Sequence, residues 1–590
     1  MVPRAPIVLI LVLVTIARAS RAGEPARSSD ALPFYYDDWS LQDWGFGYAG
    51  GGYGYRPLTE EMALSAVRRF RQWRKKYGFG PDYYIVDAMW FDQRGDYRRW
   101  DPKGFPNGPK ALLEAMRDAG LKLGLWYNLN SGELKEDNWV PQEPAWRTSY
   151  NPELKGYCLS EGPYLDGLRA AWEYAYNEWG LRVIKLDFAT LDIPPPGKPR
   201  SSEATDANIR AFHRMVSGFR GVHPGVKFLF YNGFIYDYAQ ISDTFQPPHS
   251  PIINPEWLSV ADWLYAGDVR PSDWPALRLR RSADFYQDHQ VRRFHWAGFP
   301  LERIDDSGCF VGTGISAFEL GAEDWRGTWI LHLLRGGHKP HLYGDPNLLN
   351  EEDVRWMKDT YQRVSELYAR GAVTEVLGGY PGEGEPFGYR LSYQGSGLVV
   401  VANPSWKRIK YRLRFENNIQ LPAVVLASDG AVEIPVTSGL GFVDVEIGPS
   451  QVVLLGLGEE AARPLPSREL TPGTWPMDLE PVKIVRQSSA NEELKFEAAA
   501  VPKGATLYWV VQFKNAQGRF RWDLGTKLVA DQLKVKAEGG KASQVVPARP
   551  LWPGISWSVI VIKEISGVAT LRLVPNEFVT DFDVAAYQAK

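Results

Sequence analysis

The sequence contains little of what marks several common classes of protein. It has only two cysteines in 590 residues, so no cysteine-ligated metal site has the required spacing and no disulfide framework is needed. No run of lysines or arginines is long enough to indicate a nucleic-acid partner, and the formal net charge is only −3. No glycine-rich phosphate fingerprint opens a helix, which counts against nucleotide binding. We therefore expect a neutral small or polymeric substrate.

Long apolar runs are confined to the N-terminus. Arg4 precedes an apolar run at 7–16, and small residues follow up to Ala19 and Ala22. This pattern is typical of a signal peptide cut after Ala19 or Ala22. The run is too short to cross a bilayer comfortably, and a retained N-terminal anchor is the alternative. We predict a signal peptide over residues 1–22 and an exported protein, periplasmic or extracellular, with no membrane span after cleavage.

The two cysteines, Cys158 and Cys309, both lie beyond the predicted cleavage site. In an exported protein they can pair, but two buried free thiols fit the sequence equally well. Neither residue lies in a motif that would lower the pKa of its thiol, which argues against a catalytic cysteine.

Aromatic residues are abundant instead. The chain has 23 Trp and 29 Tyr, and aromatic residues make up 13% of it. Such a composition fits a globular protein with a large β-rich core and not a disordered one. It fits equally well a sugar-binding protein, because flat aromatic rings stack on the apolar C–H faces of pyranose rings. Composition alone does not separate these two interpretations.

Strand-like and helix-like segments alternate from about residue 40 to 345. Apolar periodicity and Pro or Gly boundaries mark these segments. We expect strands at 83–86, 121–127, 182–188, 226–231 and 260–265, and helices at 109–119 and 165–179. Repeated strand–helix–strand order implies parallel pairing through right-handed crossovers. About 300 residues of it suit a (β/α)8 TIM barrel better than an open doubly wound sheet.

The pattern changes after a last long helix expected at 351–370. Short alternating strands follow, which are typical of β-sandwiches, and a Pro-rich stretch separates two groups of them. We predict an α/β fold, with a TIM barrel followed by one or two C-terminal β-sandwich domains. The predicted boundaries are a catalytic barrel at 30–371, a β-sandwich at 372–460, a linker at 461–477 and a C-terminal β-sandwich at 478–590.

Polar residues that end apolar strands are the candidates for chemistry, because reactive groups of such barrels lie at the C-terminal ends of the strands. The sequence places these residues at Asp87, Asn128, Asp187, Asn232, and Asp262 with Asp268. Strand alternation puts Lys185 and Asp187 on one face. At the barrel mouth the lysine favours the ionised carboxylate that a nucleophile requires. A structural ion pair is the alternative interpretation.

A retaining glycosidase needs two carboxylates roughly 5–5.5 Å apart, one as nucleophile and one as acid/base. Asp187 is our candidate nucleophile. Asp268 follows the sixth strand and is our candidate acid/base, in which role its pKa would have to lie near about 6 or higher. The competing carboxylates for that role are Asp262, Asp273, Asp305 and Asp306.

At these residues the sequence resembles the α-galactosidase-like families 36 and 27 of glycoside hydrolase clan D. The run Asp87-Ala88-Met89-Trp90-Phe91, followed by Gly95-Asp96-Tyr97 and a Lys-Gly-Phe-Pro-Asn-Gly segment at 103–108, resembles the family 36 pattern DDGWF…GDW…KFPNGL. Leu123 to Trp126 is similar to the GLW strand, and Lys185-Leu186-Asp187 to the K-x-D nucleophile motif. Trp263 to Asp268 has the W-x4-D spacing of family 27, and 336–346 resembles the last barrel strand. The resemblance covers roughly residues 35–460.

The resemblance implies retaining cleavage of an α-glycoside, with Asp187 as nucleophile and Asp268 as acid/base. It also implies that Asp87, Trp126 and Lys185 grip the sugar. Two further residues are candidates for sugar contacts: Asn232, with a backbone-capping role as the alternative, and Trp44, which we expect at the end of the first strand, with packing at the barrel mouth as the alternative. No metal and no cofactor is expected, and His338 and His341 are expected to be barrel residues without metal.

The sequence departs from that family in three ways. The clan's galactose-binding enzymes usually have two consecutive Asp at the second strand, but the second is Ala88 here. The large N-terminal β-domain of family 36 has no room before the barrel, and the Arg that family 27 places after the acid/base-strand Trp is Leu264. The loss at position 88 makes a sugar other than galactose a realistic substrate. We therefore predict a secreted retaining α-glycosidase acting on an oligosaccharide or glycoconjugate, with a transglycosylase or a non-catalytic glycan-binding protein as alternatives.

Overall fold

The computed structural model describes most of residues 32–589. The residues outside the description are 1–31, 43, 48–51, 56–57, 135–138, 235–254, 268–273, 312–323, 417, 489–492, 499–500, 515–534, 545–556, 566, 576–578 and 590. The predicted signal peptide and the predicted acid/base Asp268 both lie outside the described residues. No helix among those described is long and apolar enough to cross a membrane.

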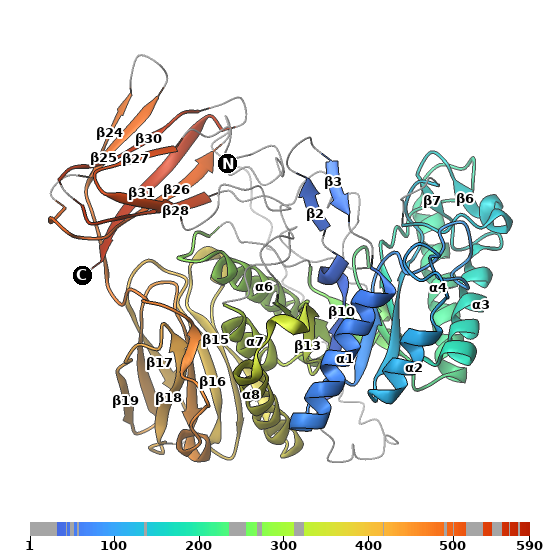
Figure 1. Ribbon diagram of the computed structural model, residues 1–590, viewed down its shortest axis with the longest axis horizontal. Helices are drawn as coiled ribbons and strands as arrows, with labels where there is room; N and C mark the ends of the chain where they lie inside the picture. Colours follow the sequence, from blue (N-terminus) through green and yellow to red (C-terminus); the bar gives the residue numbers. More distant parts are fainter. Residues whose placement is uncertain are drawn as a thin grey trace, which may run out of the picture.

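A parallel sheet, with helices between its strands in the sequence, makes up the N-terminal half of the molecule (Figure 1). In the described residues its spatial order is β11-β10-β9-β8-β5-β4-β1-β13-β12. The strands are β1 Tyr35–Asp37, β4 Tyr83–Val86, β5 Lys122–Asn128, β8 Leu181–Asp187, β9 Lys227–Phe230, β10 Trp263–Tyr265, β11 Ile304–Asp305, β12 Cys309–Val311 and β13 His341–Gly344. The helices are α1 Glu60–Tyr77, α2 Lys110–Asp118, α3 Tyr164–Tyr174, α4 Ser202–Val222, α6 Leu279–Trp296, α7 Trp325–Leu334 and α8 Glu351–Ala369.

The two edge strands of this sheet are one stretch of chain. β11 pairs in parallel with β10, and β12 pairs in parallel with β13. Only three residues separate β11 from β12, and among them Ser307 and Gly308 have positive φ angles of 67° and 77°. The segment 304–311 therefore contacts both edges of the sheet and closes it into a barrel. The predicted TIM-barrel architecture is confirmed, with an interrupted seventh strand.

Helix boundaries follow the local signals in the sequence. Thr59 accepts a hydrogen bond from the backbone N–H of Met62 at the start of α1, and the left-handed Gly78 (φ 62°) ends it. Acidic residues occupy the first turn and basic residues the last, which suits the helix dipole. The expected helix at 165–179 instead has an α-helical part, α3, followed by a π-helical turn, Ala175–Trp179.

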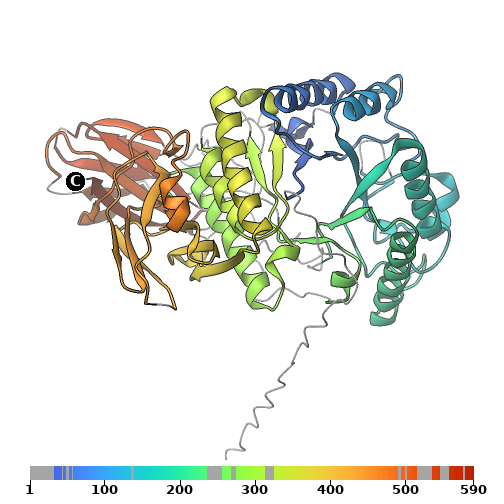
Figure 2. The same cartoon turned by 90° about the horizontal axis from the view of Figure 1, so that it is seen from below.

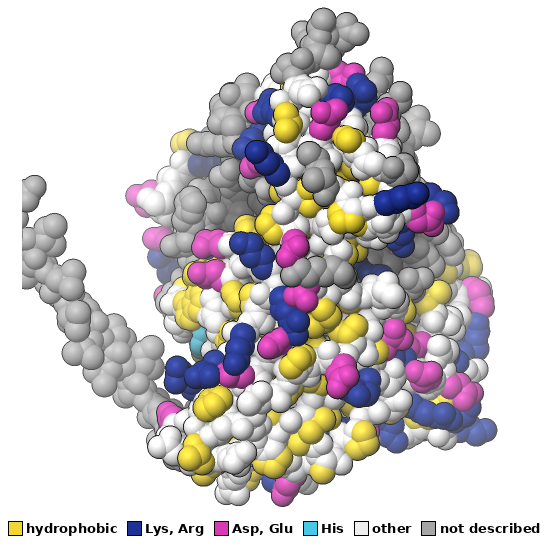
Figure 3. Space-filling model, turned by 90° about the vertical axis from the view of Figure 1, so that its left-hand side faces the viewer, with side chains coloured by type: hydrophobic (Ala, Val, Ile, Leu, Met, Phe, Trp, Pro, Cys, Tyr) yellow, Lys and Arg dark blue, Asp and Glu magenta, His cyan; other side chains and the backbone are white. Residues whose placement is uncertain are grey.

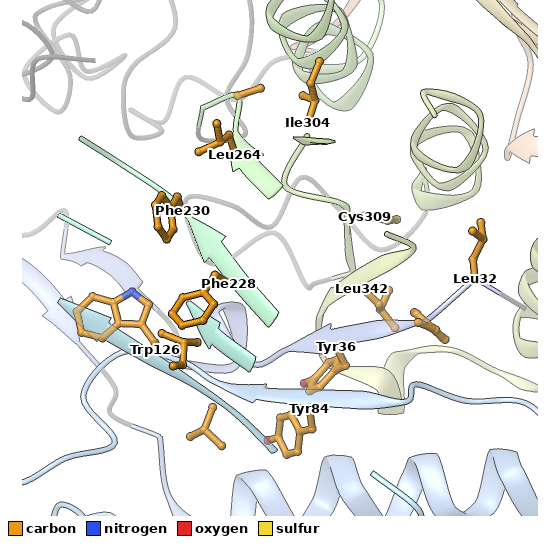
Figure 4. Close-up of a cluster of buried hydrophobic side chains, with 14 of the residues drawn as sticks. Leu32, Tyr36, Tyr84, Trp126, Phe228, Phe230, Leu264, Ile304, Cys309 and Leu342 are labelled. Atoms are coloured by element: carbon orange, nitrogen blue, oxygen red, sulfur yellow. The ribbon is translucent and has the colours of Figure 1, made fainter. Parts of the chain in front are cut away.

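Alternation along the strands separates an inner layer from an outer one. Inward side chains fill the barrel and include Tyr35, Ile85, Val183, Leu229, Tyr231, Trp263 and Tyr265. The opposite faces of the strands contribute to the larger cluster that the helices cover. Figure 4 shows members of that cluster, among them Tyr36, Tyr84, Phe228, Leu264 and Leu342. The core thus has two apolar layers, with the polar site at the strand ends.

The first β-sandwich packs directly on the barrel helices. Its sheets have the orders β14-β15-β16-β21-β18-β22 and β17-β20-β19. The strands are β14 Val373–Gly378, β15 Phe387–Tyr393, β16 Ser396–Ala402, β17 Ile409–Arg414, β18 Ala423–Asp429, β19 Val436–Gly439, β20 Phe442–Ile447, β21 Val452–Leu457 and β22 Glu469–Thr471. Figures 1 and 2 both place α6, α7 and α8 between the barrel strands and this sandwich.

β16 explains how the two domains share a core. All seven of its residues are buried. Leu398 and Val400 join the barrel cluster, whereas Val399 and Val401 join the sandwich cluster. A strand that is covered on both faces has apolar residues at consecutive positions. The sequence of β16 has such a run at 398–402.

The predicted linker is partly structured. Within it, β22 pairs in parallel with β18, and Leu470 and Trp475 are buried. Burial of these apolar side chains fixes the stretch against the first sandwich.

The second sandwich has a core of its own. Its sheets are β23-β31-β26-β29-β28 and β24-β25-β30-β27. The strands are β23 Leu479–Pro481, β24 Ile484–Ser488, β25 Leu494–Ala498, β26 Leu507–Lys514, β27 Val535–Glu538, β28 Lys541–Gln544, β29 Trp557–Lys563, β30 Ala569–Leu573 and β31 Asp581–Ala589.

On the face in Figure 3, described acidic and basic side chains are interspersed and form no continuous basic patch.

Candidate active site

The candidate site is built on the C-terminal ends of β1, β4, β5 and β8. β5 and β8 pair so that Trp126 is beside Lys185 and Asn128 is beside Asp187. Alternation directs Lys185 and Asp187 into the barrel, while Ile184 and Leu186 join the outer apolar layer. The predicted shared face of Lys185 and Asp187 is therefore present, with Asp187 closer to the mouth.

Asp187 is held by hydrogen bonds to both of its carboxylate oxygens. Its Oδ1 accepts from the backbone N–H of Phe188 (2.8 Å) and of Asn232 (3.2 Å). Its Oδ2 accepts from Nε1 of Trp126 (3.2 Å). Three N–H donors favour the ionised carboxylate and fix its orientation. The residue is 8% exposed, against 1% for Asp87, so it is the more accessible of the two carboxylates.

The backbone beside Asp187 has an unusual conformation. Phe188 has a positive φ of 51°, a region that non-glycine residues rarely adopt. Its ring packs edge-on against Trp139, 4.8 Å between ring centroids, and Trp126 lies further away at 6.1 Å. The strained residue is the one whose N–H donates to Asp187, and such strain is common at functional sites.

Lys185 forms a buried ionic cluster two residues deeper. Its Nζ donates to Oδ2 of Asp37 (2.8 Å) and to Oδ2 of Asp87 (2.7 Å). Burial opposes the charge of the ammonium group, but the two carboxylates outweigh it and raise the pKa of Lys185. Burial and the nearby Asp87 raise the pKa of Asp37, against the opposing effect of Lys185. The cluster therefore holds Lys185 as a cation that cannot serve as a proton donor near neutral pH.

Asp37 was not among the residues predicted from the sequence. The barrel was expected at 30–371, but its alternating segments were recognised only from about residue 40, and Trp44 was expected to end the first strand. That placement is wrong: the first barrel strand is β1, which ends at Asp37. Trp44 instead begins β2 (Trp44–Gly47), which pairs with β3 (Gly52–Tyr55) in a hairpin. The sequence does contain a signal for Asp37: an aspartate ends the short apolar run at 34–37, as Asp87 follows the apolar run at 83–86.

Asp87 links this cluster to a further carboxyl group. Its Oδ1 accepts from the N–H of Ala88, and its own backbone N–H donates to Oδ1 of Asp38 (2.8 Å). Asp38 also accepts from the hydroxyl of Tyr84 (2.9 Å). Burial raises the pKa of Asp38 to about 7, with smaller opposing effects from these hydrogen bonds. Asp38 thus supports the position of Asp87 from beneath the site.

Trp126 and Asn232 both contact the candidate nucleophile. The indole N–H of Trp126 is directed at Asp187, and its backbone carbonyl accepts from Nε1 of Trp90. Asn232 acts through its backbone: its N–H donates to Asp187 and its carbonyl accepts from Ala189. The following Gly233 has φ 96°, and a Cβ there would lie 1.9 Å from the carbonyl oxygen of Ala189. These contacts come from the backbone of Asn232, so both roles considered for its side chain, a sugar contact and a backbone cap, stay predictions.

Most competitors of Asp268 have structural partners. Asp262 accepts from Arg220 (2.7 Å), from Lys227 and from the backbone of Phe228. Asp305 pairs with Lys339, and Asp306 with His332 (2.7 Å) and Arg335 (2.8 Å). Burial raises the pKa of Asp306, but the interactions with His332 and Arg335 outweigh it and lower the pKa. The remaining competitor, Asp273, lies outside the described residues.

The two cysteines, His341 and Ala88 are all buried. Cys158 and Cys309 are both buried free thiols, and burial raises the pKa of Cys309 to about 12. No group of His, Cys, Asp and Glu among the described residues could hold a metal ion. His341 lies within the barrel, with its Nδ1 2.8 Å from Nζ of Lys339. Ala88 is buried in the outer apolar layer.

No protein-family model and no curated protein matches the sequence. Among solved structures, the chain is similar to a GH36 α-galactosidase from Geobacillus stearothermophilus in complex with raffinose, at 14% identity and a TM-score of 0.49, over 73% of this chain and 56% of that one. It is also similar to α-galactosidase I from Mortierella vinacea, at 12% identity and a TM-score of 0.43, over 75% of this chain and 98% of that one. This chain thus spans little more than half the length of the Geobacillus enzyme.

Proposed function

We propose that the protein is an exported retaining α-glycosidase that acts on an oligosaccharide or glycoconjugate without a cofactor. The observation that carries this proposal is the geometry of Asp187. The carboxylate lies at the end of a barrel strand, three N–H donors orient it, and a lysine locked as a cation lies two residues deeper. A nucleophile needs this combination of a fixed position, an ionised form and access from the barrel mouth.

The proposed reaction is a double displacement. Asp187 attacks the anomeric carbon while protonated Asp268 gives its proton to the leaving oxygen, so a covalent glycosyl-enzyme forms and the aglycone departs. Asp268 then takes a proton from a water molecule, which attacks the anomeric carbon and releases Asp187. Asp268 is assigned by its spacing after β10 and by its resemblance to the family 27 pattern. The structural partners of Asp262, Asp305 and Asp306 support this choice.

Asp87 and Lys185 are the proposed sugar-binding groups beside the nucleophile. Carboxylate and ammonium groups that are already fixed by other contacts bind hydroxyl groups at a low entropic cost. Ala88 in place of a second consecutive aspartate favours a sugar other than galactose. The proposed substrates are therefore neutral α-linked pyranosides.

A panel of α-linked aryl glycosides that differ at C2, C4 and C5 tests the proposal. The wild type should release the phenol from at least one of them, and Asp187→Ala should lower kcat by about a thousandfold or more. Azide should partly restore turnover of this variant and yield the β-glycosyl azide, because it enters from the face that the nucleophile occupied. Asp262→Asn is the matched control, since it alters another strand aspartate whose partners are structural, and it should retain turnover.

The outcomes separate the alternatives. Wild-type turnover by Asp187→Ala would rule out Asp187 as the nucleophile. Silence of the wild type across the panel would contradict the α-glycosidase activity and favour glycan binding. Transfer to an added sugar acceptor that outruns hydrolysis would identify a transglycosylase that uses the same first step.

A further inference from the structure

Lys185 is enclosed on several sides by groups from four other strands. Asp37 at the end of β1 and Asp87 after β4 accept its hydrogen bonds. Its Nζ also lies 4.3 Å from the ring centroid of Tyr231, which follows β9, and 5.4 Å from that of Tyr343 on β13. Only 4% of the residue is exposed. Such an enclosure leaves the ammonium group little freedom to reorient.

The two carboxylates are themselves fixed. Oδ1 of Asp37 accepts from the backbone N–H of Trp39 (2.9 Å), and Oδ1 of Asp87 accepts from that of Ala88 (2.7 Å). Each carboxylate therefore presents Oδ2 to Lys185 and cannot rotate without losing a backbone hydrogen bond. An ammonium group has three N–H donors, and two are used here by described residues. The third has a direction that the other two determine.

Asp37 is the second carboxylate that bonds Lys185, beside Asp87. The galactose-binding enzymes that this sequence resembles usually have a second aspartate where Ala88 stands. Here Ala88 is buried in the outer apolar layer, and the second carboxylate at the lysine comes from β1.

We propose that Asp37 is a positioning residue for substrate specificity: together with Asp87 it aims the remaining N–H of Lys185 at one hydroxyl group of the sugar. This inference rests on the proposed function. The targeted hydroxyl accepts a hydrogen bond from Lys185, so the substrate has a neutral oxygen there. A protonated amino group at the same carbon would face the ammonium group and would be rejected.

Asp37→Asn tests this role because it keeps an acceptor oxygen and removes the charge. Burial lowers the pKa of Lys185, and Asp37 is the largest opposing effect, followed by Asp87. The other groups that face Lys185 are Tyr231 and Tyr343, and Lys339 and His341 lie beyond them with a charge interaction to it. Removing the charge of Asp37 therefore makes Lys185 lose its proton at a lower pH.

The readout is the pH dependence of kcat/KM with an α-glycosyl fluoride of the preferred sugar. Fluoride departs with little need for a proton, so loss of the proton of the acid/base does not dominate the alkaline limb. We expect KM of Asp37→Asn to rise roughly ten- to hundredfold and kcat to change less, as for a lost contact with a charged donor. Lys185 keeps its proton far above neutral pH in the wild type, so an alkaline limb due to loss of this proton should appear at lower pH in Asp37→Asn than in the wild type. Adding Lys185→Arg should remove that limb, because arginine does not titrate in this range.

Asp305→Asn is the matched control, since Asp305 is an equally buried carboxylate paired with another lysine of the barrel, Lys339. It should leave the alkaline limb where it is in the wild type. If Asp37→Asn does not fold, Asp37→Ser provides the same readouts with a smaller side chain. A folded variant at position 37 with the wild-type alkaline limb and KM would overturn this inference alone. A wild type that cleaves no α-glycoside would overturn the proposed function instead.

Discussion

At the scale of single residues, the site depends on a few N–H donors with fixed directions. Among the described residues, three such donors bond Asp187, and one of the three, the indole of Trp126, belongs to a side chain. The two backbone donors depend on the conformations of the turns after β8 and β9. Substitution can therefore remove the Trp126 donor with little change in the fold, whereas the backbone donors change only with the chain path.

Trp126→Phe should lower kcat about ten- to hundredfold, the usual effect of losing a hydrogen bond to a charged group. The ring is retained, so packing against Phe91 and Trp139 should persist. The measurement is kcat on the preferred aryl glycoside together with the melting temperature. Trp329→Phe removes another buried indole donor, which donates to Thr360 of α8 and not to a residue of the candidate site. This control should leave kcat unchanged. Equal loss of kcat in the two variants would contradict the role of the Trp126 N–H.

Asp38 predicts a dependence of stability on pH. Its pKa is about 7 in the folded state and about 3.9 in an unfolded chain. The folded state therefore binds more protons between these values, and stability falls as the pH rises from about 4 to about 7, by at most about 1.4 kcal/mol per pH unit. Asp38→Asn lacks this loss, so its melting temperature relative to the wild type should rise over that range and level off above it.

Differential scanning fluorimetry from pH 4 to 8 measures this difference. Asp444→Asn is the control, because Arg412 and other basic neighbours lower the pKa of Asp444 to about 2 in the folded state, so it is ionised throughout the upper part of the range. Its difference from the wild type should be flat between pH 5 and 8. A flat difference for Asp38→Asn as well would show that Asp38 stays ionised in the folded protein.

At the scale of elements, the turns after the barrel strands decide the site geometry. The turn after β9 is the clearest case, because Asn232 bonds both Asp187 and Ala189. Only glycine at position 233 allows this close approach of two backbones, given its φ of 96° and the nearby carbonyl.

Gly233→Ala should therefore destabilise the fold by roughly 2–4 kcal/mol and lower kcat more than tenfold, because the N–H of Asn232 leaves Asp187. Urea unfolding and turnover of the same preparation provide both values. Gly225→Ala is a suitable control, since a Cβ there has open space and no strained φ is required. Normal turnover of Gly233→Ala would mean that the Asn232 donor is dispensable.

Buried ion pairs connect the elements behind the site. Arg335 on the turn after α7 bonds Asp288 of α6 and Asp306 between β11 and β12. Arg281 of α6 bonds Asp284 and Asp429, and Asp429 belongs to β18 of the first sandwich. Such pairs are costly to break, because the remaining partner would be a buried unpaired charge. They fix α6 and α7 to the interrupted seventh strand and to the sandwich.

At the scale of the whole molecule, the barrel and the first sandwich share one core, and the second sandwich has a core of its own together with a smaller cluster that also includes Leu277 and Trp406. We expect calorimetry to resolve two transitions, one for the barrel with the first sandwich and one for the second sandwich. Val400→Ala should lower the temperature of only the first of these transitions, because Val400 is a β16 residue in the core that the barrel and the first sandwich share. Ile562→Ala should lower that of only the second. A shift of both transitions in either variant would contradict separate cooperative units.

The sequence by itself determined the barrel, the order of its main strands and the placement of Lys185 and Asp187 on one face. These features depend on local periodicity: apolar runs of strand length, helices between them, and side chains that alternate by two. It also located Asp87, which follows such a run, whereas Trp126 was singled out by the resemblance of its strand to the GLW pattern.

Tertiary structure decided the partners of these residues. Asp37 and Lys185 are 148 positions apart, and only the parallel order of β1, β4, β5 and β8 brings their side chains together. The same holds for the N–H of Asn232, which reaches Asp187 across 45 positions, and for the interrupted seventh strand that closes the barrel. A residue pattern reports which face a side chain occupies, but closure of the sheet determines what it meets there.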